Sequence, residues 1–169
     1  QPPLRKDWLS VMDYVAMRNS GKAFPTDLMT PPLLADRMEA NASAALDLVE
    51  GLDTERDTSL MYEVADVRIW AHLGMYYAEK LRGAVALQTY RIAGAESEKL
   101  TAIRHLERAL EEWDAVIAIS RPIYRDMPLT HYNPPNNQRT EDNLFHWALL
   151  RPAIAADVGI VRNAAFEVP

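Results

Sequence analysis

The residue types best suited to binding chemistry gather in residues 121–139, a stretch that combines tyrosine and histidine rings with amide and guanidinium groups. Such a set suits a neutral or acidic sugar, because an aromatic ring packs against the sugar's C–H face while polar groups bind its hydroxyls. The candidate carbohydrate-binding residues are Tyr124, His131, Tyr132, Asn136, Asn137 and Arg139. The alternative is that Tyr124, Leu129 and Tyr132 only close the open end of a helical bundle.

The acidic and histidine residues do not fall at the spacings of known catalytic or metal-binding motifs. A dimetal site in a helical bundle needs a Glu-x-x-His motif on two helices, and the sequence contains none. It also lacks a Gly-x-Ser-x-Gly elbow, a glycine-rich phosphate loop and His-Glu-x-x-His. With no cysteine, the sequence excludes disulfides and Cys-ligated zinc. We therefore expect no catalytic residue, metal or cofactor.

Four large aromatic residues are predicted to pack in a core, because they recur at helical spacing. They are Trp70, Tyr77, Trp113 and Trp147. Trp113 has the strongest pattern, since it lies between Leu110 and Ile117 in a stripe that steps by three and four residues. His72, close to Trp70, is predicted to be a hydrogen-bonded interior histidine.

Five predicted helices, and no strand, must position these residues. The first covers about residues 4–18, and the second begins at Thr30-Pro31, an N-cap followed by proline, and closes at 51–53. The third runs from Thr58 to Ala93 and ends at Gly94. The fourth runs from Glu96 to Ser120.

The fifth predicted helix begins after Thr140 and reaches about residue 165, with a kink or a split at Pro152. The connection before it is therefore a long loop, and loops of this length are often functional. We expect any binding site in this loop and at the start of the fifth helix. Gly74 and Gly83 lie inside the third helix, where they favour the close approach of a neighbouring helix.

Composition is consistent with one globular domain spanning residues 1–169. Of the 169 residues 49% are apolar and 25% charged, and no apolar run is long enough to span a membrane. The net charge of −6 argues against a nucleic-acid partner. The predicted fold is all-α: an up-and-down bundle of four long helices plus a short N-terminal helix, with one long loop before the last helix. The first residue is Gln1, as in a module excised from a longer chain or in a processed protein.

Three helical stretches have a texture seen in known domains, namely TPPLLADRMEANASAAL at 30–46, YEVADVRIWAHLGMYYAEKLRGAVALQTYR at 62–91 and AIRHLERALEEWDAVIAI at 102–119. Together, over about residues 27–120, they resemble helical accessory domains of large bacterial polysaccharide-degrading enzymes. The resemblance implies a non-catalytic, secreted or periplasmic module that binds a glycan or braces a neighbouring catalytic domain. It transfers no catalytic residue. Two alternatives stay open, namely a helical protein–protein interaction domain and an autonomous enzyme of unknown reaction.

Overall fold

The computed structural model describes residues 7–21, 23–133 and 138–166, and this part of the chain is mostly helical. Its helices are α1 (Val11–Asn19), α2 (Pro31–Val49), α3 (Thr58–Ala93), α4 (Glu96–Ser120) and α5 (Trp147–Arg162). Between α4 and α5 lie strands β1 (Met127–Asn133) and β2 (Gln138–Phe145), which pair antiparallel. The mostly helical character is confirmed. The expectation of no strand is wrong.

The starts of α2 and α3 and the end of α3 follow from local chemistry and agree with the prediction. The side chain of Thr30 accepts a hydrogen bond from the backbone N–H of Leu33 at the start of α2, and Asp57 does the same for Leu60 at the start of α3. Gly94 ends α3 in the left-handed conformation, at φ 70°, which glycine adopts without strain.

The first helix differs from its prediction. It begins only at Val11, because Ser10 is its N-cap and accepts a hydrogen bond from the backbone N–H of Asp13. Trp8 precedes it and forms an isolated parallel bridge with Met29. The start of the predicted helix, including Leu4, lies outside the described residues.

The fifth helix also begins later than predicted. Thr140 lies in β2, where it pairs with His131, so the N-cap of α5 is His146 instead. The predicted long loop is therefore largely a β-hairpin. Pro152 lies inside α5, which continues through it, so of the two predicted alternatives the split is wrong and the kink stays a prediction.

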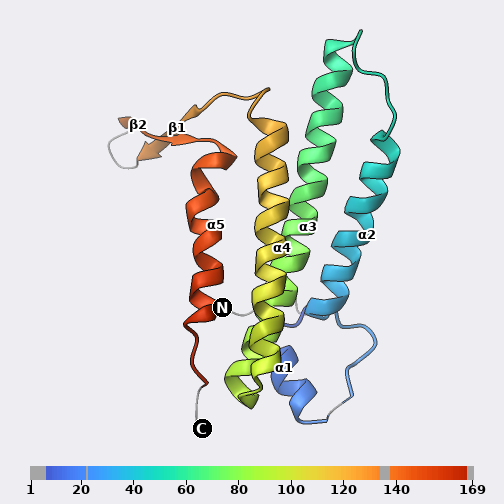
Figure 1. The fold of residues 1–169 in the computed structure, drawn as a ribbon, viewed down its shortest axis with the longest axis vertical. Coiled ribbons are helices and arrows are strands. Elements are labelled where there is room, and N and C mark those ends of the chain that lie inside the picture. The colour runs from blue at the N-terminus through green and yellow to red at the C-terminus, as the bar shows by residue number, and fades with distance from the viewer. Residues whose placement is uncertain (1–6, 22, 134–137, 167–169) are drawn as a thin grey trace.

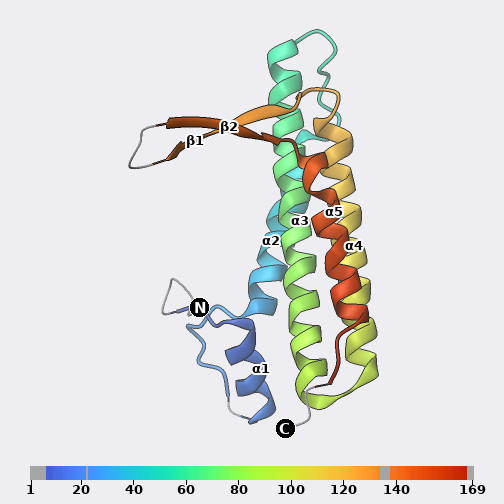
Figure 2. The same ribbon diagram turned by 90° about the vertical axis from the view of Figure 1, so that its left-hand side faces the viewer.

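Figure 1 shows α2, α3, α4 and α5 extending alongside one another. α3 packs against α1, α2 and α4, and α4 in turn packs against α5. Figure 2 shows the hairpin projecting sideways, away from the long axis of the helices. No helix in the described ranges combines the length and the apolar character needed to cross a membrane.

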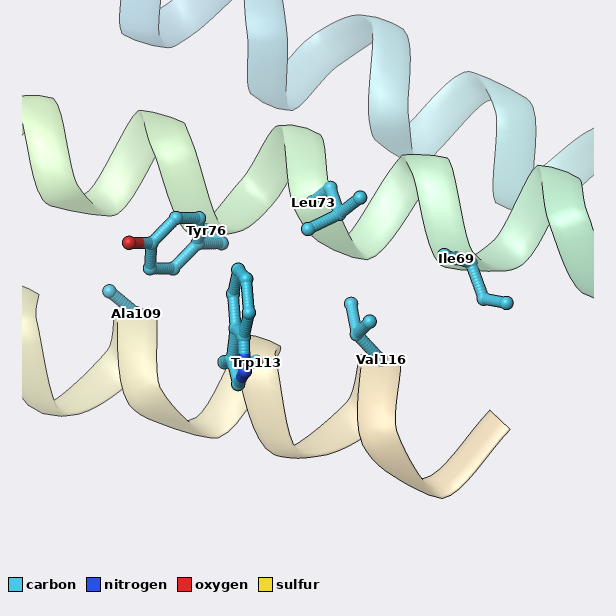
Figure 3. Packing of buried hydrophobic residues seen from close by; sticks show 6 residues of the cluster. All are labelled: Ile69, Leu73, Tyr76, Ala109, Trp113 and Val116. Atoms are coloured by element: carbon cyan, nitrogen blue, oxygen red, sulfur yellow. The ribbon is translucent and has the colours of Figure 1, made fainter. Parts of the chain in front are cut away.

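The largest aromatic of the core is Trp113, whose ring points from α4 toward α3 (Figure 3). It is 3% exposed, and its indole N–H donates to the backbone carbonyl of Trp147 at 3.1 Å. The rings of Tyr76 and Trp147 meet it edge-on, with centroids 4.9 and 5.6 Å away. The structure thus confirms that Trp113 is a core residue and shows that it joins α3, α4 and the start of α5.

Two glycines allow the helices to come close together. A Cβ atom on Gly74 would lie 3.3 Å from the Cβ of Ala42 on α2. A Cβ atom on Gly83 would lie 3.1 Å from the Cδ2 of Leu106 on α4. The predicted close approach at both positions is confirmed, and it brings α2 and α4 tightly against α3.

Candidate ligand-binding site

The most exposed large aromatic side chain on α3 is Trp70, at 68%, and Tyr77 is 53% exposed. Both were predicted to be core residues, and for both the prediction is wrong. The two are seven residues apart and so lie on one side of the helix. The packing partners of α3 leave that side uncovered, whereas Ile69, Leu73 and Tyr76 face α4.

Trp70 borders a groove of about 640 Å³ between α2 and α3. The groove is lined from α2 by Met38, Asn41, Ala42 and Ala45, and from α3 by Glu63, Asp66, Val67, Trp70, Ala71 and Gly74. Four of these residues, Ala42, Ala45, Ala71 and Gly74, are small, and at Ala42 and Gly74 the two helices come close together. The groove thus combines one large exposed ring with an apolar floor and three hydrogen-bonding side chains.

The position of the Asp66 carboxylate is fixed by a hydrogen bond from a residue that does not line the groove. The hydroxyl of Tyr124 donates to Oδ1 of Asp66 at 2.6 Å. This hydrogen bond, together with burial, raises the pKa of Tyr124 to about 12. The phenol therefore remains a neutral donor across the physiological range, and Asp66 keeps its second oxygen as an acceptor for a ligand.

A second, smaller cavity of about 210 Å³ lies on the other side of Trp70 and Asp66, which border both spaces. The remaining lining residues come from α3, from the base of the hairpin and from the start of α5: Ile69, Tyr124, Arg125, Met127, Phe145, His146 and Trp147. We call this space the aromatic cavity, because four of its nine lining residues are Trp70, Tyr124, Phe145 and Trp147.

The one buried side-chain nitrogen or oxygen atom without a partner among the described residues is Nε2 of His146. The residue is 2% exposed and serves as the N-cap of α5, where Nδ1 accepts a hydrogen bond from the backbone N–H of Ala148 at 3.0 Å. Sequence reasoning missed this role. The predicted fifth helix began after Thr140, which placed His146 inside the helix rather than at its N-cap.

The predicted sugar-binding residues divide between two places. Tyr124 borders the aromatic cavity and also packs against the Trp113 cluster. Its position therefore fits both alternatives, a ligand-binding residue and a residue that closes the end of the bundle. In the hairpin Tyr132 pairs with Arg139. Tyr132 is five residues beyond Met127, which lies at the base of the hairpin, and five residues of a strand span about 17 Å. His131 pairs with Thr140 in the same hairpin, whereas Asn136 and Asn137 lie outside the described residues.

The other histidines are held in polar pairs on the helices. Nδ1 of His72 lies 2.7 Å from Glu112, and Nδ1 of His105 lies 2.7 Å from the buried Glu79, which also accepts from Arg82 at 2.9 Å. His72 is hydrogen-bonded, as predicted, but its side chain is 23% exposed, so it is only partly interior. Within the described ranges, no three histidine or acidic side chains are grouped so that they could hold a metal ion.

The comparisons with known proteins supply no family for this chain, since no family model, curated protein or solved structure matches it. The groove and the aromatic cavity are therefore the basis on which a function can be argued.

Proposed function

We propose that this chain is a non-catalytic module that binds a neutral glycan in the groove between α2 and α3. The observation that carries the proposal is the exposure of Trp70, at 68%, beside that groove. Keeping so large an apolar ring in water is unfavourable unless a ligand covers it. A sugar does so through its C–H face, while its hydroxyls reach the polar groups at the rim.

The charges around the groove favour a neutral sugar. Among the described residues that line it, the two ionisable ones are Glu63 and Asp66, and none is a cation. Carboxylates accept hydrogen bonds from hydroxyls, and Asn41 offers both a donor and an acceptor. An acidic sugar would instead meet two negative charges, on a chain whose net charge is already −6.

The size of the groove favours a stretch of glycan over a single sugar. Its volume of about 640 Å³ lies within the range of about 300–1,000 Å³ typical of small-molecule sites. A short oligosaccharide segment fits such a space, with one ring stacked on Trp70. The groove follows two adjacent helices, so a chain can enter and leave along them.

The resemblance of residues 27–120 supplies the context of this proposal. It supports a secreted or periplasmic accessory module of a bacterial carbohydrate-active enzyme, in which a neighbouring catalytic domain cleaves the bound polysaccharide. We further propose that α2–α5 act as an up-and-down bundle. The successive packing of α2 on α3, α3 on α4 and α4 on α5 supports this arrangement.

A second function is favoured by a different surface. The end of α2, the connection after it and the start of α3 carry exposed apolar side chains: Leu48, Leu52, Met61 and Tyr62, of which Leu48 is 79% exposed. Figure 1 shows the start of α3 and the connection that leads to it from α2 extending beyond the end of α4. Contact with the neighbouring catalytic domain would cover these side chains, so the module would brace that domain.

Affinity electrophoresis tests the glycan proposal. The chain is run through native gels that contain a neutral polysaccharide (a xylan, a mannan or a β-glucan) or an acidic one such as polygalacturonate. We expect retardation by at least one neutral polysaccharide, and loss of that retardation in Trp70→Ala. Tyr77→Ala is the matched control, because it removes an exposed aromatic from the same side of α3 and leaves the groove lining intact. Equal behaviour of the two variants would contradict the proposal.

A further inference from the structure

One side of α5 carries apolar side chains that no described element covers. Five exposed residues make up this side, which we call the outer face of α5: Leu149, Pro152, Ala153, Ala156 and Ile160. They follow one another at steps of one, three and four residues and so lie on one side of the helix. Leu149 is 48% exposed and Ile160 is 57% exposed. Figure 2 looks onto α5 from outside the row of helices, and no other helix lies in front of it.

The outer face of α5 contains no charged residue. Each of the three charged residues of the helix instead forms an ion pair with α3 or α4: Arg151 with Asp114, Asp157 with Lys80, and Arg162 with Glu107. The opposite side of α5 is also apolar, and its Val158 and Val161 are buried in the core. A helix at the surface usually presents charged side chains to water, whereas a helix that is apolar on both sides is covered on both. The composition of α5 is therefore that of a helix with a second packing partner.

The charges of the chain show where a second copy can approach. Two copies, each with a net charge of −6, repel one another. The other exposed apolar surface, at the end of α2 and the start of α3, lies in residues 47–63, which contain six acidic residues and one basic residue. A second copy would meet like charges there. At the outer face of α5 it would meet none, and the ion pairs beside that face are already neutralised.

The order of side-chain sizes along the outer face is the same in both directions. Leu149, Ala153, Ala156 and Ile160 are separated by four, three and four residues, with large side chains at the ends and small ones in the middle. In a pair with two-fold symmetry the contacts are reciprocal. An antiparallel pair therefore sets Leu149 against Ile160 of the second copy, and Ala153 against its Ala156. The small central residues let the two helices approach closely, and the large residues fill the space at both ends.

We propose that the outer face of α5 is the interface of a homodimer, in which α5 of one copy packs antiparallel against α5 of the other. A helix of 16 residues is about 24 Å long, so one helix face offers less than the roughly 800 Å² per partner of a standard interface. The dimer is accordingly weak, and we expect a dissociation constant of about 1–100 µM. No residue of α5 lines the groove between α2 and α3, so this proposal does not depend on the glycan proposal.

Sedimentation equilibrium of the intact chain at increasing concentration tests the proposal. We expect the mass to rise from 19.1 kDa toward twice that value. Ala156→Glu introduces a carboxylate on each copy at the centre of the interface and should weaken dimerisation at least about tenfold. Ala40→Glu is the matched control, because it makes the same change at an exposed alanine of α2 and should dimerise like the unaltered chain. A monomer at every concentration, or a dimer that Ala156→Glu leaves unchanged, would overturn the proposal.

Mixing two variants of opposite charge separates a lost interface from a damaged fold. Ala156→Glu and Ala156→Lys should each be monomeric alone, because like charges face one another across the two-fold axis. An equimolar mixture should recover a mixed dimer, since the charges are then opposite. Damage to the fold would not be repaired by mixing. Absence of a mixed dimer would contradict the proposed pairing of α5 with α5.

Introduced cysteines report the direction of the pairing, because the chain contains no cysteine of its own. Ala153→Cys and Ala156→Cys are mixed and oxidised, and the disulfide-linked peptides are identified by mass spectrometry. An antiparallel pair predicts a disulfide that joins position 153 of one copy to position 156 of the other. Links of 153 to 153 and of 156 to 156 in its place would indicate a parallel pair and contradict the antiparallel arrangement.

Discussion

Replacing Trp113 by alanine should destabilise the fold more than any other single tryptophan-to-alanine change on α3 or α4. The side chain is 3% exposed and contacts α3 and the start of α5. A buried tryptophan removes about 150–250 Å² from water. At about 25 cal/mol per Å² this corresponds to about 4–6 kcal/mol. Measured values for such truncations are about 3–5 kcal/mol, and we expect this range for the loss in free energy of unfolding.

Trp70→Ala is the matched control, because the chemical change is identical and the side chain is 68% exposed. About a third of the area is buried there, so the same arithmetic gives about 1–2 kcal/mol. Urea denaturation followed by far-UV circular dichroism measures both variants. In a chain of this length each kcal/mol lowers Tm by about 2–4 °C, so Trp113→Ala should melt about 6–20 °C below the unaltered chain. Equal losses in the two variants would refute the assigned packing of α3 against α4.

Two further predictions concern the close helix contacts and the phenol of Tyr124. Gly83→Ala should lower the free energy of unfolding by about 1 kcal/mol, because the new Cβ meets Leu106 at 3.1 Å. In Gly159→Ala the new Cβ meets nothing within 4 Å, so this variant should raise the free energy of unfolding by about 0.5–1 kcal/mol. Thermal melts that rank the two variants in the opposite order would contradict the packing of α3 on α4. The raised pKa of Tyr124, about 12 against about 10 unfolded, means that the folded state favours the neutral phenol, so this stabilisation is present below pH 10 and is lost as the pH rises toward 12. The stability of the unaltered chain should therefore fall toward that of Tyr124→Phe over this range in urea titrations, and a constant difference would contradict the hydrogen bond to Asp66.

The start of α2 and the end of α3 were predictable because local signals determine them. Thr30 followed by proline starts α2, and a glycine with positive φ ends α3. The late start of α5 was not predictable in this way. It depends on pairing between β1 and β2, and on a histidine N-cap, which is uncommon.

The hairpin was missed because its prolines indicated a loop. Pro128 nevertheless lies in β1, in a sheet of two strands where both are edges and one side of each needs no hydrogen bonds. A proline there removes a donor that can face away from the partner strand. Sequence alone does not show which side of a strand its partner occupies.

The sequence predicted the region of the candidate site correctly, but it missed most of the residues that form the site. The connection after α4 and the start of α5 do border the aromatic cavity, as expected. However, Trp70 and Trp113 each lie at helical spacing from apolar residues of their own helix. Only the packing of the neighbouring helices leaves Trp70 exposed. That difference arises from contacts between distant parts of the chain, which periodicity within one helix does not reveal.

The most direct test of the central proposal is to locate the bound glycan by NMR. An oligosaccharide of the retarding polysaccharide is titrated into ¹⁵N-labelled chain, whose four tryptophans each give an indole N–H signal. The glycan proposal predicts that the Trp70 indole signal shifts most, with accompanying backbone shifts at Asn41 and Asp66 and little change at Trp113. Shifts concentrated instead at Tyr132 and Arg139 would place binding on the hairpin and contradict the assignment to the groove.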